Sequence, residues 1–472
     1  PAKDTRGRAA STRQERNVSN TGLDLFAKAQ KLIPGGVQLF SKNPQATSPG
    51  AWPSYYSQAS GSYIRDLAGE EYLDMSHCGV GACPLGYNDP DVNAAVIAAV
   101  NRGSSCSLNN PEEVELAELL CNIHPWADMV RYTRGGGEAM AVAVRIARAA
   151  TGKSGVITAG YHGWHDWYLA GKKCPEKFRA YDSFVGTNFD GIPDELAGTA
   201  IPFKFGDVTS MSRAVEASFK GSHNNLAAIV IDTSRDMLKD VQIKEFLEAA
   251  NLLAQSYNAV LIYDEVSGGF RGNFGRHQNK DGTWRSPDIA VFGKAISNGF
   301  AFGAVIGRRE VMEAANNTFI SSTYWTESLG PAAALATIKK LHHEHVSGAL
   351  NRRGIVFTNR VEGEFLARKG SLPINIEFHG IWPLRRFLFV PTNPDPGINP
   401  EAYATLFTEM MLRRGILATN QFYPMLTHTN KHIEQYCRAL RDFCRVISGN
   451  PPAGIPGLLH GPVRLSHPVR RN

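Results

Sequence analysis

Short apolar runs that alternate with helical stretches constrain the fold of this chain more than any other feature. They cover residues 129–132, 155–158, 227–232, 259–264, 289–292 and 303–306. Several of these runs are apolar on both faces, which is typical of strands buried between two helix layers in a mostly parallel sheet. Because such α/β folds bind ligands beyond the carboxyl ends of their strands, we expect functional residues directly after these runs.

The length of 472 residues suits one large α/β domain with a smaller appended domain. Beyond the last run, strands predicted at residues 374–378 and 385–390 are flanked by helices, which indicates an α+β domain. The sequence predicts a division into a flexible basic arm at 1–20, an N-terminal segment at 21–85, a large domain at 86–345, a small domain at 346–448, and a Pro/Gly-rich tail without secondary structure at 449–472.

The formal net charge of +6 lies in the two tails. Basic residues exceed acidic ones by three in residues 1–20 and again by three in residues 451–472, so the rest of the chain is balanced. A neutral body does not favour a nucleic-acid partner. The apolar runs fall short of the ~18 residues of a membrane helix, and no secretory signal is visible. With seven scattered cysteines and no zinc-type spacing, we expect a cytoplasmic protein without a metal site or a membrane partner.

Two chemically active side chains follow neighbouring predicted strands. Asp264 ends the run at 259–264, just before a glycine-rich turn. A buried carboxylate there needs a cationic or protonated partner, since leaving it unpaired costs several kcal/mol. Lys294 follows the run at 289–292 among small and apolar residues, where desolvation makes a lysine amine nucleophilic and suited to a Schiff base. Either residue alone would fit an ordinary strand end, whereas the pair points to chemistry.

Two further segments complete the pattern. Residues 135–137 are three glycines between a predicted strand and an Ala-rich helix, where backbone amides and the helix dipole favour an anion such as a phosphate. Their spacing matches neither a dinucleotide fingerprint nor a Walker loop. Tyr161, His162 and Trp164 follow another strand and offer a flat surface for a heteroaromatic ring, or ordinary packing. An acid, a lysine, a phosphate cradle and an aromatic plate are the parts that pyridoxal 5′-phosphate (PLP) requires.

Residues 22–445 resemble a class III aminotransferase of the type I PLP fold, in the branch of the glutamate-1-semialdehyde aminomutases. The matching segments are the phosphate turn (SGTEA in the family), the YHG segment whose Tyr stacks on the cofactor ring, the DEV segment, the GK segment and a phosphate-binding Thr. The residues that take these places here, and that the resemblance implies bind the cofactor, are Gly136, Gly137, Tyr161, His162, Asp264, Val266, Lys294 and Thr323.

The resemblance also implies an architecture. It is an α/β protein with a mostly parallel central sheet in a large PLP-binding domain, and a small α+β domain built from the N- and C-terminal segments. The segment at 21–85 would contribute to the small domain and to dimer contacts. Thr323 would reach the cofactor phosphate of the neighbouring subunit, so the resemblance predicts a homodimer with shared active sites.

The sequence departs from the family pattern at several places. Gly137 replaces the Thr of the phosphate turn, and Asp232-Thr233 stands where the family has Glu-Pro. Lys42 replaces an Arg that holds the substrate carboxylate, and a lysine does not reproduce its bidentate contact, which predicts a substrate other than glutamate-1-semialdehyde. Residues expected to contact the substrate are Lys42, Val80, Trp164, Glu327 and Tyr423, with His165, Asp166 and Tyr324 near the same site.

The leading functional hypothesis is a PLP-dependent aminotransferase. In it Lys294 would bind the cofactor covalently and then move a proton as general acid and base, while Asp264 would pair with the pyridine nitrogen. An amino donor would pass its amino group to an aldehyde or ketone of a small polar or sugar-like metabolite. The first alternative is an aminomutase, which exchanges amino and carbonyl groups within one substrate. The second is a PLP-binding regulator without turnover, which the lack of a DNA-binding helix-turn-helix disfavours.

Overall fold

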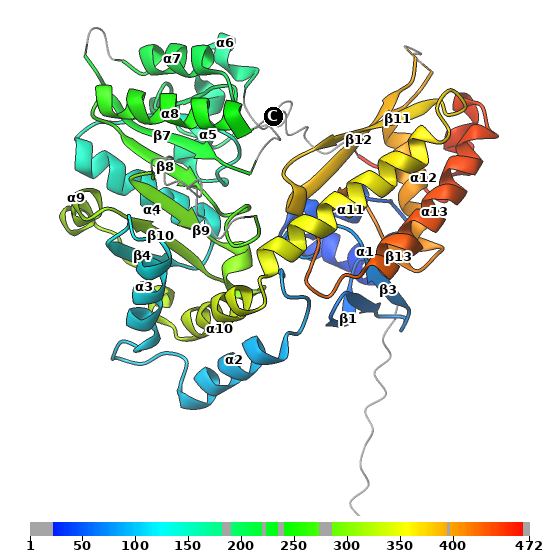
Figure 1. Cartoon of the computed structure of the whole chain (residues 1–472), viewed down its shortest axis with the longest axis horizontal. Helices are drawn as coiled ribbons and strands as arrows, with labels where there is room; N and C mark the ends of the chain where they lie inside the picture. The colour runs from blue at the N-terminus through cyan, green and yellow to red at the C-terminus, as the bar shows by residue number, and fades with distance from the viewer. Residues whose placement is uncertain are drawn as a thin grey trace, which may run out of the picture.

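The protein forms two lobes, as a computed structural model of the chain shows (Figure 1). The structure describes residues 22–181, 190–219, 223–234, 240–272, 286–393 and 397–465, so the predicted arm at 1–20 lies outside it. The larger lobe contains the central sheet, and the smaller lobe contains both α1 (Gly22–Leu32) and α13 (Asn430–Ser448).

A seven-stranded sheet forms the core of the larger lobe. Its order is β4-β10-β9-β8-β7-β5-β6, and every strand except β10 runs parallel to the others. The strands are β4 (Met129–Thr133), β5 (Gly155–Ala159), β6 (Ala200–Pro202), β7 (Leu226–Asp232), β8 (Val260–Asp264), β9 (Ile289–Phe292) and β10 (Gly303–Gly307). The predicted runs are confirmed as strands, and the short edge strand β6 is the one that the sequence does not predict.

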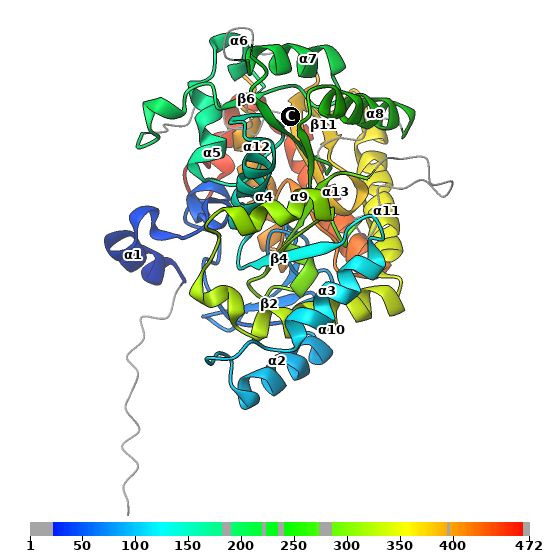
Figure 2. The same ribbon diagram turned by 90° about the vertical axis from the view of Figure 1, so that its left-hand side faces the viewer.

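Helices cover both faces of this sheet, which explains the doubly apolar strands. In β9, Ile289 and Val291 pack with α4, α5 and α9 on one face, and Ala290 and Phe292 pack with α2, α3 and α10 on the other. Figure 2 shows α2, α3 and α10 at the end of the lobe opposite α7. The helices are α2 (Pro90–Arg102), α3 (Glu112–Ile123), α4 (Gly136–Thr151), α5 (Asp166–Leu169), α6 (Glu176–Arg179), α7 (Val208–Ala217), α8 (Asp240–Ser256), α9 (Arg309–Met312) and α10 (Leu329–His343).

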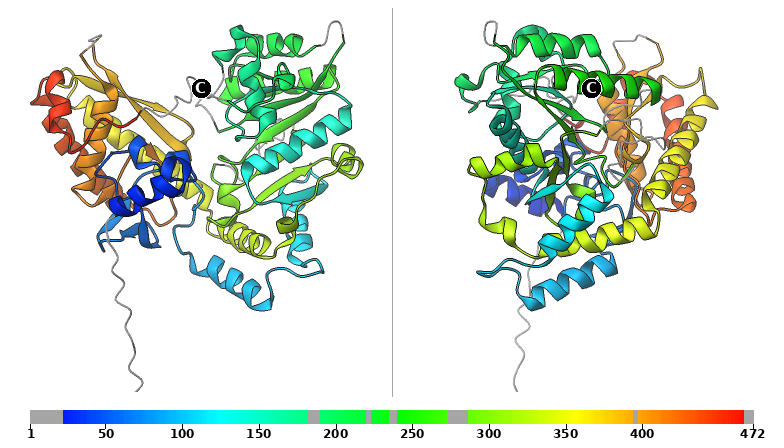
Figure 3. Two further views of the ribbon diagram at one scale, coloured as in Figure 1. Left: turned by 180° about the vertical axis from the view of Figure 1, so that it is seen from behind. Right: turned by 60° about the vertical axis from the view of Figure 1, so that its left-hand side comes forward.

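The smaller lobe joins segments from both ends of the chain. Strand β13 pairs in parallel with β3, and Leu73 and Met75 share a core with Phe357, Phe407 and Phe443. Figure 3 shows α1 lying on this lobe beside the C-terminal elements. Its elements are β1 (Tyr56–Ser60), β2 (Tyr63–Asp66), β3 (Glu71–Asp74), β11 (Ile374–His379), β12 (Arg385–Pro391), β13 (Ile416–Leu417), β14 (Gln421–Phe422), α1 (Gly22–Leu32), α11 (Val346–Leu366), α12 (Pro400–Leu412) and α13 (Asn430–Ser448).

Local sequence signals mark where these helices begin. Asp89 accepts hydrogen bonds from the first-turn amides of α2, and Pro90 starts that helix with its fixed φ. The Asp89 carboxylate also accepts a hydrogen bond from Lys340 of α10, at 2.8 Å, which ties the two helices together. In α13, Thr429 and His432 form a reciprocal capping box.

The C-terminal tail differs from the prediction. Residues Pro452–Leu458 form a 3₁₀ helix that starts at a proline, and Ile455 is fully buried in the core of the smaller lobe. Arg464 pairs with Glu401 of α12 at 2.5 Å. The prediction of a tail without secondary structure is therefore wrong for this stretch, because one buried isoleucine anchors an otherwise Pro/Gly-rich segment. Within the described ranges, no helix is long and apolar enough to cross a membrane.

Candidate active site

A buried carboxylate and a buried histidine meet at the C-terminal edge of the sheet. Asp264 ends β8 with a side chain only 4% exposed, and one of its oxygens accepts a hydrogen bond from the Val266 amide at 3.0 Å. Its other oxygen, Oδ2, lies 2.7 Å from Nδ1 of His162, in the loop after β5. Both residues are predicted from the sequence as cofactor contacts, but their contact with each other is not. Among the described residues, the buried Nε2 of His162 has no hydrogen-bond partner.

Lys294 lies at the same edge of the sheet. It follows β9, whose Val291 pairs with Asp264 across the ladder, and it begins the 3₁₀ helix Lys294–Ser297 with a left-handed φ of +45°. Its Nζ donates a hydrogen bond to Oγ of Ser267 at 2.6 Å. A left-handed conformation is costly for a residue with a side chain and persists only where its surroundings impose it. The fold thus places a primary amine beside the end of β8.

Val266 packs between the glycine turn and Gly293, the residue before Lys294. A Cβ atom on Gly136, the first residue of α4, would lie 2.6 Å from Cγ1 of Val266. A Cβ atom on Gly293 would lie 3.3 Å from the same methyl group. Only glycine therefore fits at position 136 without movement of Val266, and the first turn of α4, which has no side-chain cap, starts beside the Lys294 segment. The amides of a first turn have no partner inside the helix and favour an anion.

Glu265 is buried directly beside this cluster. It is 1% exposed, and Thr233 donates a hydrogen bond to its Oε1 at 2.6 Å. Burial raises the pKa of Glu265 to about 8, the Thr233 hydrogen bond acts against this, and the carboxylates of Asp264 and Asp232 add to it. The carboxyl is therefore mainly protonated at neutral pH. Thr233, one of the departures from the family pattern, holds this acid in place.

Val80 lies in a left-handed turn. The φ angles of Cys78, Gly79, Val80 and Gly81 are +45°, +65°, +58° and +78°, and the Gly81 amide closes the turn onto the His77 carbonyl at 2.8 Å. We refer to residues 78–81 as the left-handed turn. A β-branched residue such as Val80 is strained in this conformation, at about 1–2 kcal/mol. Strain of this kind is concentrated at functional sites.

Two more predicted substrate residues lie next to the left-handed turn. Lys42 is exposed, and its charge contributes to lowering the pKa of His77, for which burial is the larger cause. The Tyr423 amide donates to the Ser76 carbonyl at 3.0 Å, and the Tyr423 ring lies 3.5 Å from where a Cβ atom of Gly81 would be. The structure therefore brings together Lys42, Val80 and Tyr423 from three distant segments.

Two buried side chains attach this region to the larger lobe. Arg271 is fully buried and donates to the carbonyls of Gly81 at 3.0 Å, Pro383 at 3.2 Å and Pro424 at 2.7 Å. Asn298, four residues after Lys294, accepts from the Leu85 amide at 3.0 Å and donates to the Gly86 carbonyl at 3.1 Å. The residues around the left-handed turn are thereby held close to the Lys294 segment.

Glu327 makes several contacts within the protein. Its Oε1 lies 2.7 Å from Nε of Arg134, and its carboxylate accepts hydrogen bonds from the amides of Leu329 and Gly330 at the start of α10. Glu327 therefore has a structural role in this chain, because it caps α10 and forms an ion pair with Arg134. Its contact with substrate stays a prediction.

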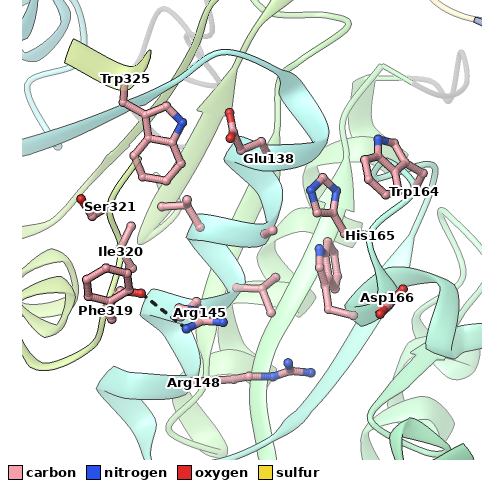
Figure 4. A pocket seen from close by; sticks show the side chains of 14 residues that line it. Glu138, Arg145, Arg148, Trp164, His165, Asp166, Phe319, Ile320, Ser321 and Trp325 are labelled. Carbon is pink, nitrogen blue, oxygen red and sulfur yellow. Dashed lines mark hydrogen bonds between the residues drawn. The ribbon is translucent and has the colours of Figure 1, made fainter. Parts of the chain in front are cut away.

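A cavity of about 720 Å³ lies along α4, on the side facing away from the sheet (Figure 4). Glu138, Arg148, His165 and Trp325 line it, together with Trp164, which is 70% exposed. Tyr161 packs edge-on against Tyr168, with ring centroids 6.1 Å apart. Thr323, at the start of the 3₁₀ helix Thr323–Thr326, is exposed to solvent near this cavity wall.

Sequence reasoning missed Ser267, Asn298 and Arg271. Ser267 lies only three residues after Asp264, so its proximity to the strand edge was a usable signal. Asn298 and Arg271 act through long-range contacts that leave no local pattern. In the described part of the chain, His, Cys, Asp and Glu side chains form no group of three or more that could hold a metal ion.

Comparison with known proteins places the chain in a family. Residues 46–365 match the family model described as aminotransferase class-III. A 3-aminobutyryl-CoA aminotransferase of Cloacimonas acidaminovorans is 31% identical over 358 residues, which cover 75% of this chain and 80% of that protein. A glutamate-1-semialdehyde 2,1-aminomutase of Ignicoccus hospitalis is 30% identical over 440 residues, covering 90% and 99%.

A solved structure shares the fold. The FumI protein of Sphingopyxis sp. MTA144, in its PLP internal aldimine form, superimposes with a TM-score of 0.77 at 20% identity and covers 93% of this chain and 99% of its own. The chain therefore belongs to the class-III aminotransferases, a family of PLP-dependent enzymes.

Proposed function

We propose that this protein is an aminotransferase that moves an amino group from an amino donor to an aldehyde or ketone of a small polar metabolite. One observation carries the proposal. The Lys294 amine lies at the same sheet edge as a buried Asp264–His162 pair, with Ser267 as its hydrogen-bond acceptor. This arrangement offers a nucleophilic amine and a fixed negative charge to one planar cofactor.

The residues present fit PLP. A Cβ atom on Gly136 would collide with Val266, whereas one on Gly135 would meet nothing within 4 Å, so the backbone before the first amides of α4 is open to a phosphate. Asp264 would keep the pyridine nitrogen protonated. Val266 and Tyr161 would pack against the cofactor ring. Lys294 is the group to hold the cofactor covalently. When bound, PLP supplies an electron sink that stabilises negative charge at the substrate carbon.

The side chains of this chain then have distinct tasks. His162 Nδ1 donates to Asp264, which orients the carboxylate and supports its negative charge. Lys294, once its amine is released, is the base that can move a proton at the substrate carbon. Ser267 is 2.6 Å from that amine and gives it a fixed position while it is not bound to the cofactor.

We further propose that two copies of the chain share their active sites. Phe319, Tyr324 and Trp164 are 83%, 73% and 70% exposed, which is unusual for large aromatic side chains and indicates a surface that another molecule covers. Thr323 lies exposed among them, available to a phosphate in a second copy. Mixing inactive Lys294→Ala and Thr323→Asp chains tests this, because a hybrid dimer regains one intact site. Absence of any recovered activity in verified hybrids would contradict shared sites.

The aminomutase reaction is the second candidate. The match to the Ignicoccus hospitalis aminomutase over 90% of this chain favours it. The departure from the family pattern at Lys42 favours a different substrate and hence the aminotransferase. Net consumption of an amino donor distinguishes the two reactions, since an aminomutase needs none.

The experiment is a screen of amino donors paired with carbonyl acceptors, using the purified holoenzyme. Mass spectrometry would follow both the aminated acceptor and the deaminated donor. We expect equal formation of the two products by the wild type and none by Lys294→Ala. Isomerisation of a single compound without donor loss would support the aminomutase instead, and equal rates for wild type and Lys294→Ala would refute the role of the lysine.

A further inference from the structure

A histidine lies next to the phosphate turn, at the place where the family pattern SGTEA has a threonine on the turn itself. Position 137 is glycine, so it contributes no hydroxyl. A Cβ atom built on Gly137 would lie 3.2 Å from Nδ1 of His165 and 3.3 Å from its Cε1. The imidazole therefore stands against the space that a side chain at position 137 would enter. Figure 4 shows His165 beside the first turn of α4, across from Glu138.

The loop that carries His165 can approach this closely because two glycines face each other. A Cβ atom on Gly163 would lie 2.8 Å from the Cα atom of Gly137, and Gly163 has a φ of +100°. A larger residue at position 163 would require the backbone to move, whereas one at position 137 would require the His165 ring to give way. The pair of glycines thus delivers the imidazole of His165 to the start of α4.

The ring nitrogen that faces the turn has no partner among the residues that the structure describes. Nδ1 of His165 is buried and makes no hydrogen bond to any described residue. A buried polar atom left without a partner costs about 1–3 kcal/mol, so such an atom at a ligand site indicates a contact that the ligand completes. Stacking on Trp164, with ring centroids 4.5 Å apart and planes 25° from parallel, fixes the ring orientation.

The charge state of His165 suits a hydrogen-bond donor. Burial lowers its pKa, and the carboxylates of Glu138 and Asp166 partly offset this, so the ring is neutral at pH 7 and carries one N–H. The Glu138 carboxylate already has a partner in the turn, because its Oε2 accepts a hydrogen bond from the Arg134 amide at 2.8 Å. An anion at the turn therefore meets the His165 ring and the helix amides.

We propose that Nδ1 of His165 donates a hydrogen bond to the cofactor phosphate and so replaces the hydroxyl that Gly137 lacks. This inference rests on the proposed placement of the phosphate at the start of α4. It makes Gly137 and His165 a matched pair, in which the loss of a side chain from the turn is offset by an imidazole from the neighbouring loop.

The test compares binding of PLP and of pyridoxal, which lacks the phosphate, to the full-length apoprotein by equilibrium dialysis. We expect His165→Ala to weaken PLP binding about 10- to 100-fold, the range for a hydrogen bond to a charged group, and to leave pyridoxal binding unchanged. His165→Asn places an amide nitrogen near the position of Nδ1 and should recover part of the loss. His343→Ala, which removes an exposed histidine at the end of α10, is the control and should behave as the wild type.

A double substitution provides the sharper test. Gly137→Thr alone should weaken PLP binding, because its side chain would meet the His165 ring. Gly137→Thr combined with His165→Ala should restore PLP binding to within about threefold of the wild type, since the hydroxyl then fills the vacated space. An unchanged ratio of PLP to pyridoxal affinity in His165→Ala would overturn the proposal.

Gly136→Ala separates the two possible failures. Its Cβ atom would close the turn against Val266, and it should abolish the preference for PLP over pyridoxal while far-UV circular dichroism confirms folding. If Gly136→Ala has this effect and His165→Ala has none, the His165 contact is wrong and the phosphate placement stands. If neither variant changes the preference, the phosphate placement itself is wrong.

Discussion

The end of β8 and the left-handed turn hold their side chains by opposite means. Asp264 is buried on a regular strand and bonded to His162, so its position follows from the sheet. Val80 lies on strained backbone that Arg271 ties to the rest of the protein. The comparison teaches that the parts suited to cofactor chemistry are set by topology, whereas the parts suited to choosing a substrate are set by local conformation.

The largest expected effect tests the strand side of this comparison. Asp264→Asn keeps the shape of the side chain but removes the charge that would hold the proton of the pyridine nitrogen. We expect kcat to fall about 10²-fold or more for every substrate pair alike, since electrostatic stabilisation contributes this much. Steady-state kinetics with two or more acceptors would measure it. A loss confined to one acceptor would break the comparison.

Lys42→Ala tests the region around the left-handed turn. Lys42 is exposed beside the left-handed turn, where we propose that it meets the substrate. We expect KM to rise about 10-fold for an anionic acceptor, with kcat and the affinity for PLP nearly unchanged, because a charge-assisted contact is worth about 1.5–3 kcal/mol at most. Lys339→Ala, an exposed lysine of α10, is the control. An equal fall in kcat for all acceptors would place Lys42 with the chemistry instead.

The raised pKa of Glu265 predicts how the free energy of unfolding depends on pH. Its pKa is about 8 in the folded protein and near 4.5 in the unfolded chain, so between these values the folded state holds a proton that the unfolded state has lost. The free energy of unfolding should therefore fall as pH rises through this window, by up to about 1.4 kcal/mol per pH unit from this group. Chemical denaturation of the apoprotein at pH 5, 6, 7 and 8, round values spanning roughly that window, would measure it.

Glu265→Gln should remove that part of the slope, because glutamine does not titrate. Glu216→Gln, an exposed acid on α7, should keep the slope of the wild type. If Glu265→Gln and wild type lose stability in parallel as pH rises, the raised pKa of Glu265 is wrong.

The smallest expected effect concerns strain in the left-handed turn. Val80→Gly relieves a conformation that costs a β-branched residue about 1–2 kcal/mol, against some lost packing and greater freedom of the unfolded chain. We expect the free energy of unfolding to rise by about 0.5 kcal/mol. The same change at Val100, exposed on helix α2, should lower it by about 0.5 kcal/mol. Equal losses in the two variants would show that the turn is not strained.

The sequence predicts one side of this comparison far better than the other. The strands are visible because burial on both faces requires apolar residues throughout, and Asp264 and Lys294 stand out because they are polar at the ends of those strands. Gly79 and Gly81 indicate a turn, but they do not reveal that Val80 between them is left-handed too, since valine normally avoids this conformation. The bond between Thr233 and Glu265, and the approach of Gly163 to Gly137, depend on how separate loops meet in space. The buried Ile455 likewise becomes significant only when the core that receives it is known.

Arg271 has a consequence for how this chain reaches its folded state. Its guanidinium keeps its charge in a fully buried position, with a pKa lowered by burial to about 10, and it is satisfied by carbonyls from around Gly81, Pro383 and Pro424. If one of these segments packs without the others, the buried Arg271 charge lacks some of its hydrogen-bond partners. Complete packing around Gly81 therefore requires the segment around Pro424, which is synthesised more than 300 residues later, and we expect the contacts at Arg271 to be lost together on unfolding.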